Sequence, residues 1–144
     1  MQFAGVHHVS LNVTDAAECT RFYVDVVGMT LRDDRPDFPF AGAWLQAGDQ
    51  QVHLLEVADF AAPKGQHFAL RVANLDAAKA DLESKGVKVS DPKQLGDICR
   101  QSFFQDPTGN LIEINQPLSP GRAAATKAAR KPQRPNPSAR EARP

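Results

Sequence analysis

An internal repeat runs through most of this chain. His8-Val9-Ser10-Leu11-Asn12-Val13 returns as His67-Phe68-Ala69-Leu70-Arg71-Val72, so the pattern His-x-x-Leu-x-Val recurs after 59 positions. Each copy leads into an Asp-Ala-Ala sequence that predicts a helix start, at Asp15 and at Asp76. Gly28 and Gly86 end the two helix patterns. Self-similarity at this period indicates that two copies of one supersecondary unit build the fold.

The segments after each helix predict short strands separated by turns. Asp106-Pro107-Thr108-Gly109, for example, has the composition of a type I turn. The predicted strands cover residues 30–32, 43–47 and 51–57 in the first copy, and residues 87–90, 99–105 and 110–115 in the second. The order βαβββ, used twice, predicts an α+β fold in which modules 5–58 and 65–116 form a curved mixed sheet.

Length and composition favour one domain. The chain has 144 residues, of which 42% are hydrophobic and eight are Phe, and this can supply a single core over residues 1–118. Cys19 and Cys99 are too few for a disulfide framework, so we expect reduced thiols and a cytoplasmic protein. No secretory leader pattern opens the chain, and no apolar run approaches the roughly 20 residues that span a bilayer.

The last residues differ in composition from the rest. Residues 1–116 hold 10 Lys and Arg against 16 Asp and Glu, a net charge of −6, whereas residues 117–144 hold 7 against 1, a net charge of +6. No Leu, Ile, Val or aromatic residue follows Leu118. We therefore expect residues 119–144 to be a disordered basic tail rich in Pro, Ala and Arg. The tail lacks a nucleic-acid-binding motif, so a nucleic-acid partner is not expected.

Strand alternation places polar, titratable side chains on the faces opposite the apolar ones. In the two repeated strands His8 and His67 oppose the apolar positions, and in the last strand of each copy His53 and Glu113 do the same. His53 and Glu113 are 60 positions apart, so the repeat pairs His8 with His67 and His53 with Glu113. In the same alternation His7 and Glu56 point to the other face of their strands, and we exclude both from this set.

Three imidazoles and one carboxylate suit a borderline divalent ion. Zn²⁺, Ni²⁺, Co²⁺, Fe²⁺ and Mn²⁺ all accept such ligands and leave positions open for water or substrate. Buried polar groups without partners are costly, so packing alone is a poor explanation for four of them at symmetric positions. The pattern predicts one divalent metal ion per site, bound by His8, His53, His67 and Glu113.

Several motifs together resemble the glyoxalase I branch of the vicinal oxygen chelate superfamily, which comprises glyoxalase, bleomycin resistance and dioxygenase proteins. The likeness covers residues 6–116, most of the chain except the tail. It rests on His8-Val9-Ser10-Leu11-Asn12-Val13-Thr14-Asp15, Phe22-Tyr23, Val27-Gly28-Met29, Gly42-Ala43-Trp44-Leu45, Val52-His53-Leu54-Leu55 and Asp106-Pro107-Thr108-Gly109-Asn110-Leu111-Ile112-Glu113. The resemblance implies the same four ligand positions, and it implies a homodimer whose sites combine His8 and His53 of one subunit with His67 and Glu113 of the other.

The resemblance also implies several possible reactions, namely those of glyoxalase I, of extradiol dioxygenases and of fosfomycin-type enzymes. Glyoxalase I usually has Glu where this chain has His53, and that departure puts the isomerase chemistry in question while leaving the metal site intact. An extradiol dioxygenase uses two His and one Glu, and His53 would crowd its open face. Fosfomycin-type enzymes carry hydroxyls and cations for the phosphonate on one strand, where the inward positions here are Cys99, Gln101 and Phe103.

The interpretation that remains is a Lewis-acid enzyme acting on a small oxygen-chelating substrate of the α-hydroxycarbonyl type. Glu113, or the water displaced from the metal, would serve as base. Arg71 would neutralise a substrate carboxylate, and Gln101 and Phe103 would line the substrate site. A non-catalytic binding protein of the bleomycin-resistance type is the alternative from another functional class, and a dioxygenase is the third.

Overall fold

The computed structural model describes residues 1–118, and the predicted basic tail lies outside them. The elements are β1 (His8–Val13), α1 (Ala16–Arg21), a π-helical turn η1 (Phe22–Val26), β2 (Thr30–Leu31), β3 (Gly42–Ala47), β4 (Gln50–Glu56), β5 (His67–Arg71), α2 (Leu75–Ser84), β6 (Lys93–Leu95), β7 (Cys99–Gln105) and β8 (Leu111–Pro117). The order βαβββ therefore occurs twice, as the repeat predicted.

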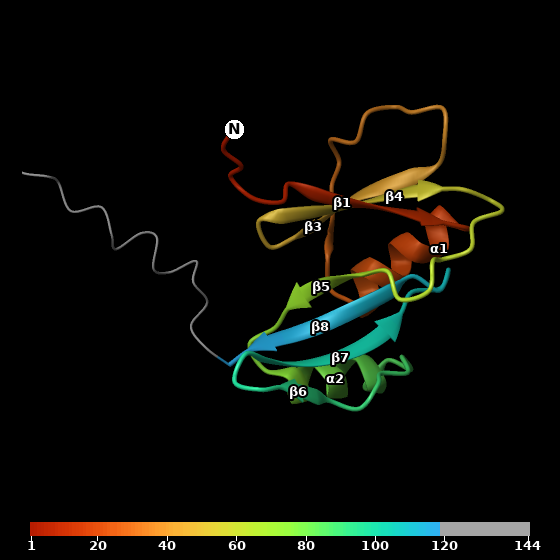
Figure 1. The fold of residues 1–144 in the computed structure, drawn as a ribbon. Coiled ribbons are helices and arrows are strands. Elements are labelled where there is room, and N and C mark those ends of the chain that lie inside the picture. The colour runs from red at the N-terminus through yellow and green to blue at the C-terminus, as the bar shows by residue number, and fades with distance from the viewer. Residues whose placement is uncertain (119–144) are drawn as a thin grey trace, which may run out of the picture.

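Each copy forms a mixed four-stranded sheet of its own. The strand orders are β1-β4-β3-β2 and β5-β8-β7-β6, and in each sheet the first strand runs parallel to its neighbour while the others are antiparallel. Figure 1 shows the two sheets one above the other, and α1 packs against β3 and β4 of the first while α2 packs against β7 and β8 of the second. We call residues 5–58 module 1 and residues 65–116 module 2.

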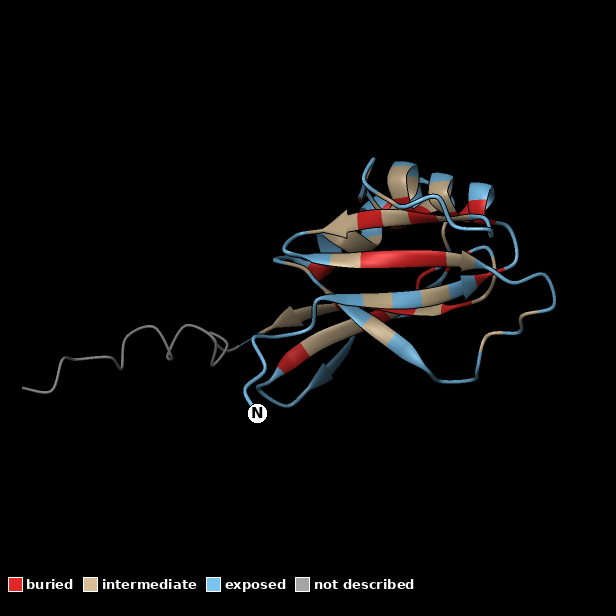
Figure 2. Cartoon of the chain, turned by 90° about the horizontal axis from the view of Figure 1, so that it is seen from above, coloured by how far each residue is buried: buried red, intermediate tan, exposed pale blue. Residues whose placement is uncertain are grey.

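One hydrophobic core joins the two modules. Buried side chains concentrate in the strands, as Figure 2 shows, and on the helix faces that pack against them. The core includes Val13, Cys19, Tyr23, Leu45, Leu54, Leu75, Leu82, Phe104, Ile112 and Ile114. Both cysteines are free and buried, in agreement with the expected reduced thiols. No helix within residues 1–118 is long and apolar enough to cross a membrane.

A buried polar network also links the modules. The Tyr23 hydroxyl donates to Asp106 Oδ2 at 3.0 Å, and the Asn110 side chain donates to the same oxygen at 2.8 Å and to the Asn12 carbonyl at 3.0 Å. Burial, followed by the nearby Asp106 charge, raises the pKa of Tyr23 well above its usual range. The phenol therefore stays protonated and keeps its role as donor.

The repeat extends to the way both helices begin. Asp15 caps α1 by accepting from the Glu18 amide, and Asn74 caps α2 by accepting from the Ala77 amide. The predicted helix start at Asp76 is wrong, since Asn74 lies 59 positions after Asp15 and takes the equivalent place. Asp76 lies in the first turn and pairs with Arg100 instead.

A second pair of caps comes from the ends of β4 and β8. Glu56 Oε2 accepts from the Ala16 amide at 2.8 Å, and Gln116 Oε1 accepts from the Leu75 amide at 2.8 Å. These two side chains are 60 positions apart. Glu56 thus satisfies a free amide at a helix N-terminus, a role compatible with its exclusion from the predicted metal site.

One predicted strand is wrong. Residues 87–90 do not form a strand, and the strand that pairs with β7 at the edge of the sheet is β6 instead. Val89 is buried, which explains the apolar alternation. Only Ser90 meets β7, where its amide donates to the Phe103 carbonyl at 2.8 Å and its hydroxyl accepts from the Phe103 amide at 2.9 Å. The side chain thus substitutes for a backbone carbonyl and ends the pairing.

Candidate metal centre

His8 and His53 form a pair on the outer face of module 1. Parallel pairing of β1 with β4 places Ser10 directly opposite His53, so His8 lies one step along the same face. The two imidazoles stack, with ring centroids 4.3 Å apart and planes 12° from parallel. His53 Nε2 lies 2.8 Å from Gln51 Oε1 on the same strand. His53 is only 9% exposed, whereas His8 is exposed.

The surroundings of His53 favour an uncharged ring. Burial is the main cause that lowers the pKa of His53, and the neighbouring His8 and His7 lower it further. His7 Nδ1 also lies 2.9 Å from His8 Nδ1. Metal binding requires a neutral imidazole, because the proton and the ion compete for the same lone pair. His53 is therefore held in the form that a metal ion binds.

His67 and Glu113 form the second pair, on the outer face of module 2. Ala69 of β5 lies opposite Glu113 of β8, so His67 occupies the neighbouring position on that face. His67 Nε2 lies 3.1 Å from Glu113 Oε2, and Glu113 is only 6% exposed. Two further contacts orient the pair: Asn115 Nδ2 donates to Glu113 Oε1 at 2.6 Å, and His67 Nδ1 donates to the Gly65 carbonyl at 2.9 Å.

The approach of His67 to Glu113 indicates what the pair can bind. The Gly65 carbonyl can only accept, so Nδ1 carries a proton and the lone pair of a neutral ring lies on Nε2. A lone pair and a carboxylate oxygen repel each other at 3.1 Å unless a positive charge lies between them. A proton between the two atoms would supply that charge, and so would a metal ion bound by both.

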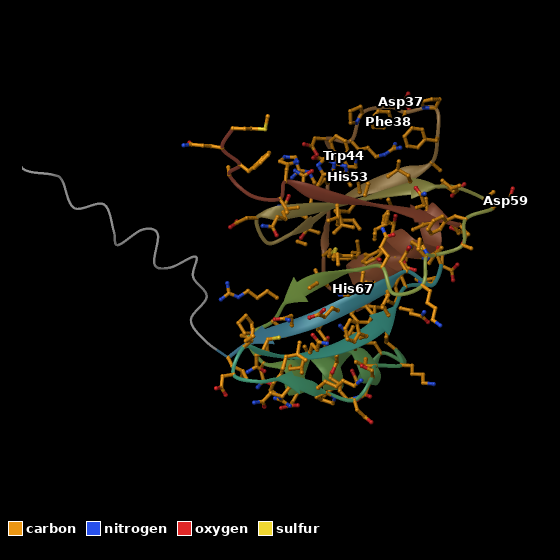
Figure 3. The ribbon with its side chains drawn as sticks, viewed as in Figure 1. Asp37, Phe38, Trp44, His53, Asp59 and His67 are labelled. Carbon is orange, nitrogen blue, oxygen red and sulfur yellow. The ribbon has the colours of Figure 1, made fainter. Side chains whose placement is uncertain are left out.

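The two pairs do not meet within one chain. Figure 3 shows His53 on module 1 and His67, apart from it, on module 2. His67 lines a hollow of about 490 Å³ between β1 and β5, whose lining contains none of the other three predicted ligands. Within residues 1–118, no group of three or more His, Cys, Asp or Glu side chains is close enough to hold a metal ion. The structure therefore keeps the predicted ligands as two separate pairs, which we call half-sites.

The predicted substrate residues lie on the same face of module 2 as His67 and Glu113. Phe103 is directly opposite Glu113 on β7, and its ring meets the His67 ring edge-on, with centroids 5.3 Å apart. Gln101 is half-buried opposite Asn115, one step further along. Arg71 is exposed at the end of β5 and borders a different hollow, of about 910 Å³. Of the three, Phe103 alone touches a predicted ligand.

Sequence reasoning missed three residues around the half-sites. Trp44 stacks on His53 with centroids 4.4 Å apart and planes 10° from parallel, while Gln51 and Asn115 hydrogen-bond to predicted ligands. Gln51 and Asn115 share the alternation of His53 and Glu113 on their own strands, whereas β3 carries no predicted site residue that would have pointed to Trp44. Trp44 is also the counterpart of Phe103, since each lies directly across the strand pair from the last ligand of its module.

Comparisons with known proteins agree with this architecture. Residues 5–114 match the model of the Glyoxalase/Bleomycin resistance protein/Dioxygenase superfamily. The protein YaeR of Escherichia coli K12 is 31% identical over 126 residues, covering 76% of this chain and 93% of YaeR, and Glyoxylase I 4 of Arabidopsis thaliana is 27% identical over 124 residues, covering 79% and 71%. The crystal structure of TnmS3, an antibiotic binding protein from Streptomyces sp. CB03234, is similar with a TM-score of 0.67 and 32% identity, covering 81% of this chain and 98% of that one.

Proposed function

Because the chain belongs to the Glyoxalase/Bleomycin resistance protein/Dioxygenase superfamily, we propose that it is a metal-dependent enzyme of the glyoxalase I type. His8, His53, His67 and Glu113 would hold one divalent ion per site, either Ni²⁺, Zn²⁺, Co²⁺, Mn²⁺ or Fe²⁺. The reaction would be a lyase or isomerase step on a small oxygen-chelating substrate of the α-hydroxycarbonyl type. The observation that carries the proposal is the approach of His67 Nε2 to Glu113 Oε2, matched by the stacked His8 and His53 at equivalent positions.

The donor set fits such an ion chemically. Imidazole nitrogens and a carboxylate are ligands of borderline divalent metals, and three of the four already have the orienting partner that such ligands require. Gln51 contacts His53, the Gly65 carbonyl orients His67, and Asn115 orients Glu113. When bound, the ion would supply Lewis acidity and would lower the pKa of a chelating substrate or of bound water.

The side chains of module 2 suggest how a proton would be handled. Asn115 occupies Glu113 Oε1 and leaves Oε2 on the side of His67. Glu113 Oε2 is therefore the atom at which a substrate proton would be accepted, with Asn115 as a positioning residue. Phe103 covers one edge of His67 and would exclude water from that side. Gln101 lies one step further along β7, where it would contact a larger substrate, and Arg71 would meet a carboxylate at the outer end of β5.

A complete site requires a second copy of the chain. β1 and β5 are edge strands of their sheets, so each module has an open edge beside its half-site. We propose a homodimer in which His8 and His53 of one subunit meet His67 and Glu113 of the other, giving two equivalent sites related by a two-fold axis. Residues 1–118 form the folded domain in this proposal, residues 119–144 are a basic tail outside it, and the protein is cytoplasmic.

Trp44 provides a direct test of metal binding. It is the single tryptophan of the chain and stacks on His53, so an ion on that imidazole should change its fluorescence. We expect titration of chelator-treated protein with Ni²⁺, Zn²⁺, Co²⁺ or Mn²⁺ to change the emission and to saturate at one ion per chain. Elemental analysis of protein purified without added metal should agree. Less than about 0.2 ion per chain, with none regained on titration, would contradict the proposal because a preformed site retains its ion.

A non-catalytic binding protein is the second candidate function. The specific observation in its favour is the 32% identity to TnmS3, which binds an antibiotic. A measurement of substrate turnover distinguishes the metal-dependent enzyme from the non-catalytic binding protein. If the metal-loaded protein converts no α-hydroxycarbonyl substrate but binds small molecules without changing them, the binding role replaces the enzymatic one.

A further inference from the structure

We propose that the ligand of this site carries a planar aromatic group next to its chelating oxygens, and that the β2–β3 loop and the paired aromatics Trp44 and Phe103 recognise it. The inference rests on the proposed function, because it takes the two half-sites to be parts of one site. The features that carry it lie outside the four ligands.

An unbroken row of aromatic rings leads from His8 and His53 into the loop. Trp44 stacks on His53, the Phe38 centroid lies 6.4 Å from that of Trp44, and Phe40 stacks on Phe38 with centroids 5.1 Å apart and planes 15° from parallel. Figure 3 shows Phe38, Trp44 and His53 in succession on module 1. The row places aromatic surface beside a ligand position, where a substituent of a metal-bound molecule would lie.

The two phenylalanines are exposed, yet the loop holds them in place. Phe38 is 38% and Phe40 is 40% exposed, although large apolar side chains are normally withdrawn from water. Arg35 explains their order: its guanidinium lies 5.0 Å from the Phe38 centroid and 5.5 Å from the Phe40 centroid, and it donates to the Phe40 carbonyl at 2.8 Å. This cation–π clamp fixes two ring faces before any ligand arrives, which lowers the ordering cost of binding.

The repeat shows that this loop is particular to module 1. Ten residues separate β2 from β3, whereas three separate β6 from β7. Gly42, where the loop enters β3, admits no larger residue, because an added Cβ would lie 2.2 Å from the Leu54 carbonyl oxygen and 3.2 Å from Arg35 Nη2. The insertion is therefore fitted closely to the sheet at the point where it places its aromatic residues.

The counterpart of Trp44 in module 2 is also aromatic. Trp44 lies directly across the strand pair from His53, and Phe103 lies directly across from Glu113. If the two half-sites bind one ion together, the rings of Trp44 and Phe103 both lie beside that ion. Aromatic rings favour aromatic partners in stacked or edge-to-face arrangements. A planar ring attached to the chelating atoms fits this surrounding better than an aliphatic chain of the same length.

Two hydroxamates test the inference, because both chelate through the same pair of oxygens and differ in one group. Calorimetric titration of Ni²⁺-loaded dimer should show benzohydroxamate binding roughly tenfold more tightly than acetohydroxamate, after correction for their affinities for free Ni²⁺. The preference should fall to about threefold or less in Phe38→Leu/Phe40→Leu and in Phe103→Leu, which keep apolar volume but remove ring faces. Ile98→Ala, at an exposed apolar residue in the short turn between β6 and β7, is the control and should keep the full preference.

Equal corrected affinities for the two hydroxamates, or a preference that survives both Phe variants, would overturn the inference. Metal content measured on the same samples separates this failure from failure of the metal site. If the protein binds no metal, the metal-free protein is titrated with both probes. A benzohydroxamate preference lost in Phe38→Leu/Phe40→Leu then supports the aromatic subsite without the metal, and no preference refutes it.

Discussion

Removal of one hydroxyl tests how the two modules are held together. Tyr23 is fully buried, and its hydroxyl donates to Asp106 Oδ2. In Tyr23→Phe the carboxylate keeps its two bonds from Asn110, one from the backbone amide and one from the side chain, so it loses one of three donors. A hydrogen bond to a charged group contributes about 1.5–3 kcal/mol. Because the ring volume is kept and no cavity forms, we expect a loss of about 2 kcal/mol in the free energy of unfolding.

The expected change in thermal stability follows from the size of the domain. For a domain of about 120 residues the unfolding entropy is about 0.25 kcal/mol/K, so a loss of about 2 kcal/mol lowers Tm by about 8 °C. Calorimetry or circular dichroism would measure it. Thr108→Val is the control: at the same module boundary it removes the exposed bonds of the Thr108 hydroxyl with the Thr14 amide and hydroxyl, together with its 3.5 Å contact with Cys19 Sγ, and should cost less than about 1 kcal/mol. A Tyr23→Phe loss no greater than that of the control would refute the reasoning.

Three further changes have expected outcomes. His67→Ala and Glu113→Ala should each abolish tight metal binding and leave the far-ultraviolet circular dichroism unchanged, and metal content equal to that of the wild type in both would contradict the ligand assignment. Glu56→Ala should cost about 1 kcal/mol by urea unfolding, because the Ala16 amide loses its acceptor, and unchanged stability would show that water replaces the side chain. Deletion of residues 120–144 should leave Tm and metal binding unchanged, since that segment has no aliphatic residue larger than Ala, and a fall of several degrees would show that it docks on the domain.

The repeat made the topology predictable, and one of the two errors arose where local sequence was followed instead of the repeat. The Asp-Ala-Ala sequence at Asp76 looked like a helix start, but the cap is Asn74, at the offset of 59 that the strands already showed. Residues 87–90 have the alternation of a strand because Val89 is buried. Burial alone does not require pairing, and the paired strand β6 is exposed and polar except for Leu95.

The candidate site was predictable as four positions but not as an arrangement. Strand parity assigned His8 and His53 to one face and His67 and Glu113 to another, and the structure has each pair in contact. The alternation of side chains along a strand gives no information on how two sheets are placed relative to each other. Only the structure could therefore show that the His8–His53 pair and the His67–Glu113 pair are separate. Gln51 and Asn115 share the strand alternation of His53 and Glu113, but alternation alone does not show which polar neighbour hydrogen-bonds to a ligand.

Subunit complementation is the most direct test of the shared metal site. A His8→Ala chain and a Glu113→Ala chain are each expected to lack tight metal binding as homodimers. In a mixed dimer both defects fall in one site, and the other combines an intact His8 and His53 with an intact His67 and Glu113. After equal mixing and confirmed subunit exchange, about half of the dimers are mixed, so about one quarter of an ion should be regained per chain. No regained metal after confirmed exchange would contradict a site shared between subunits.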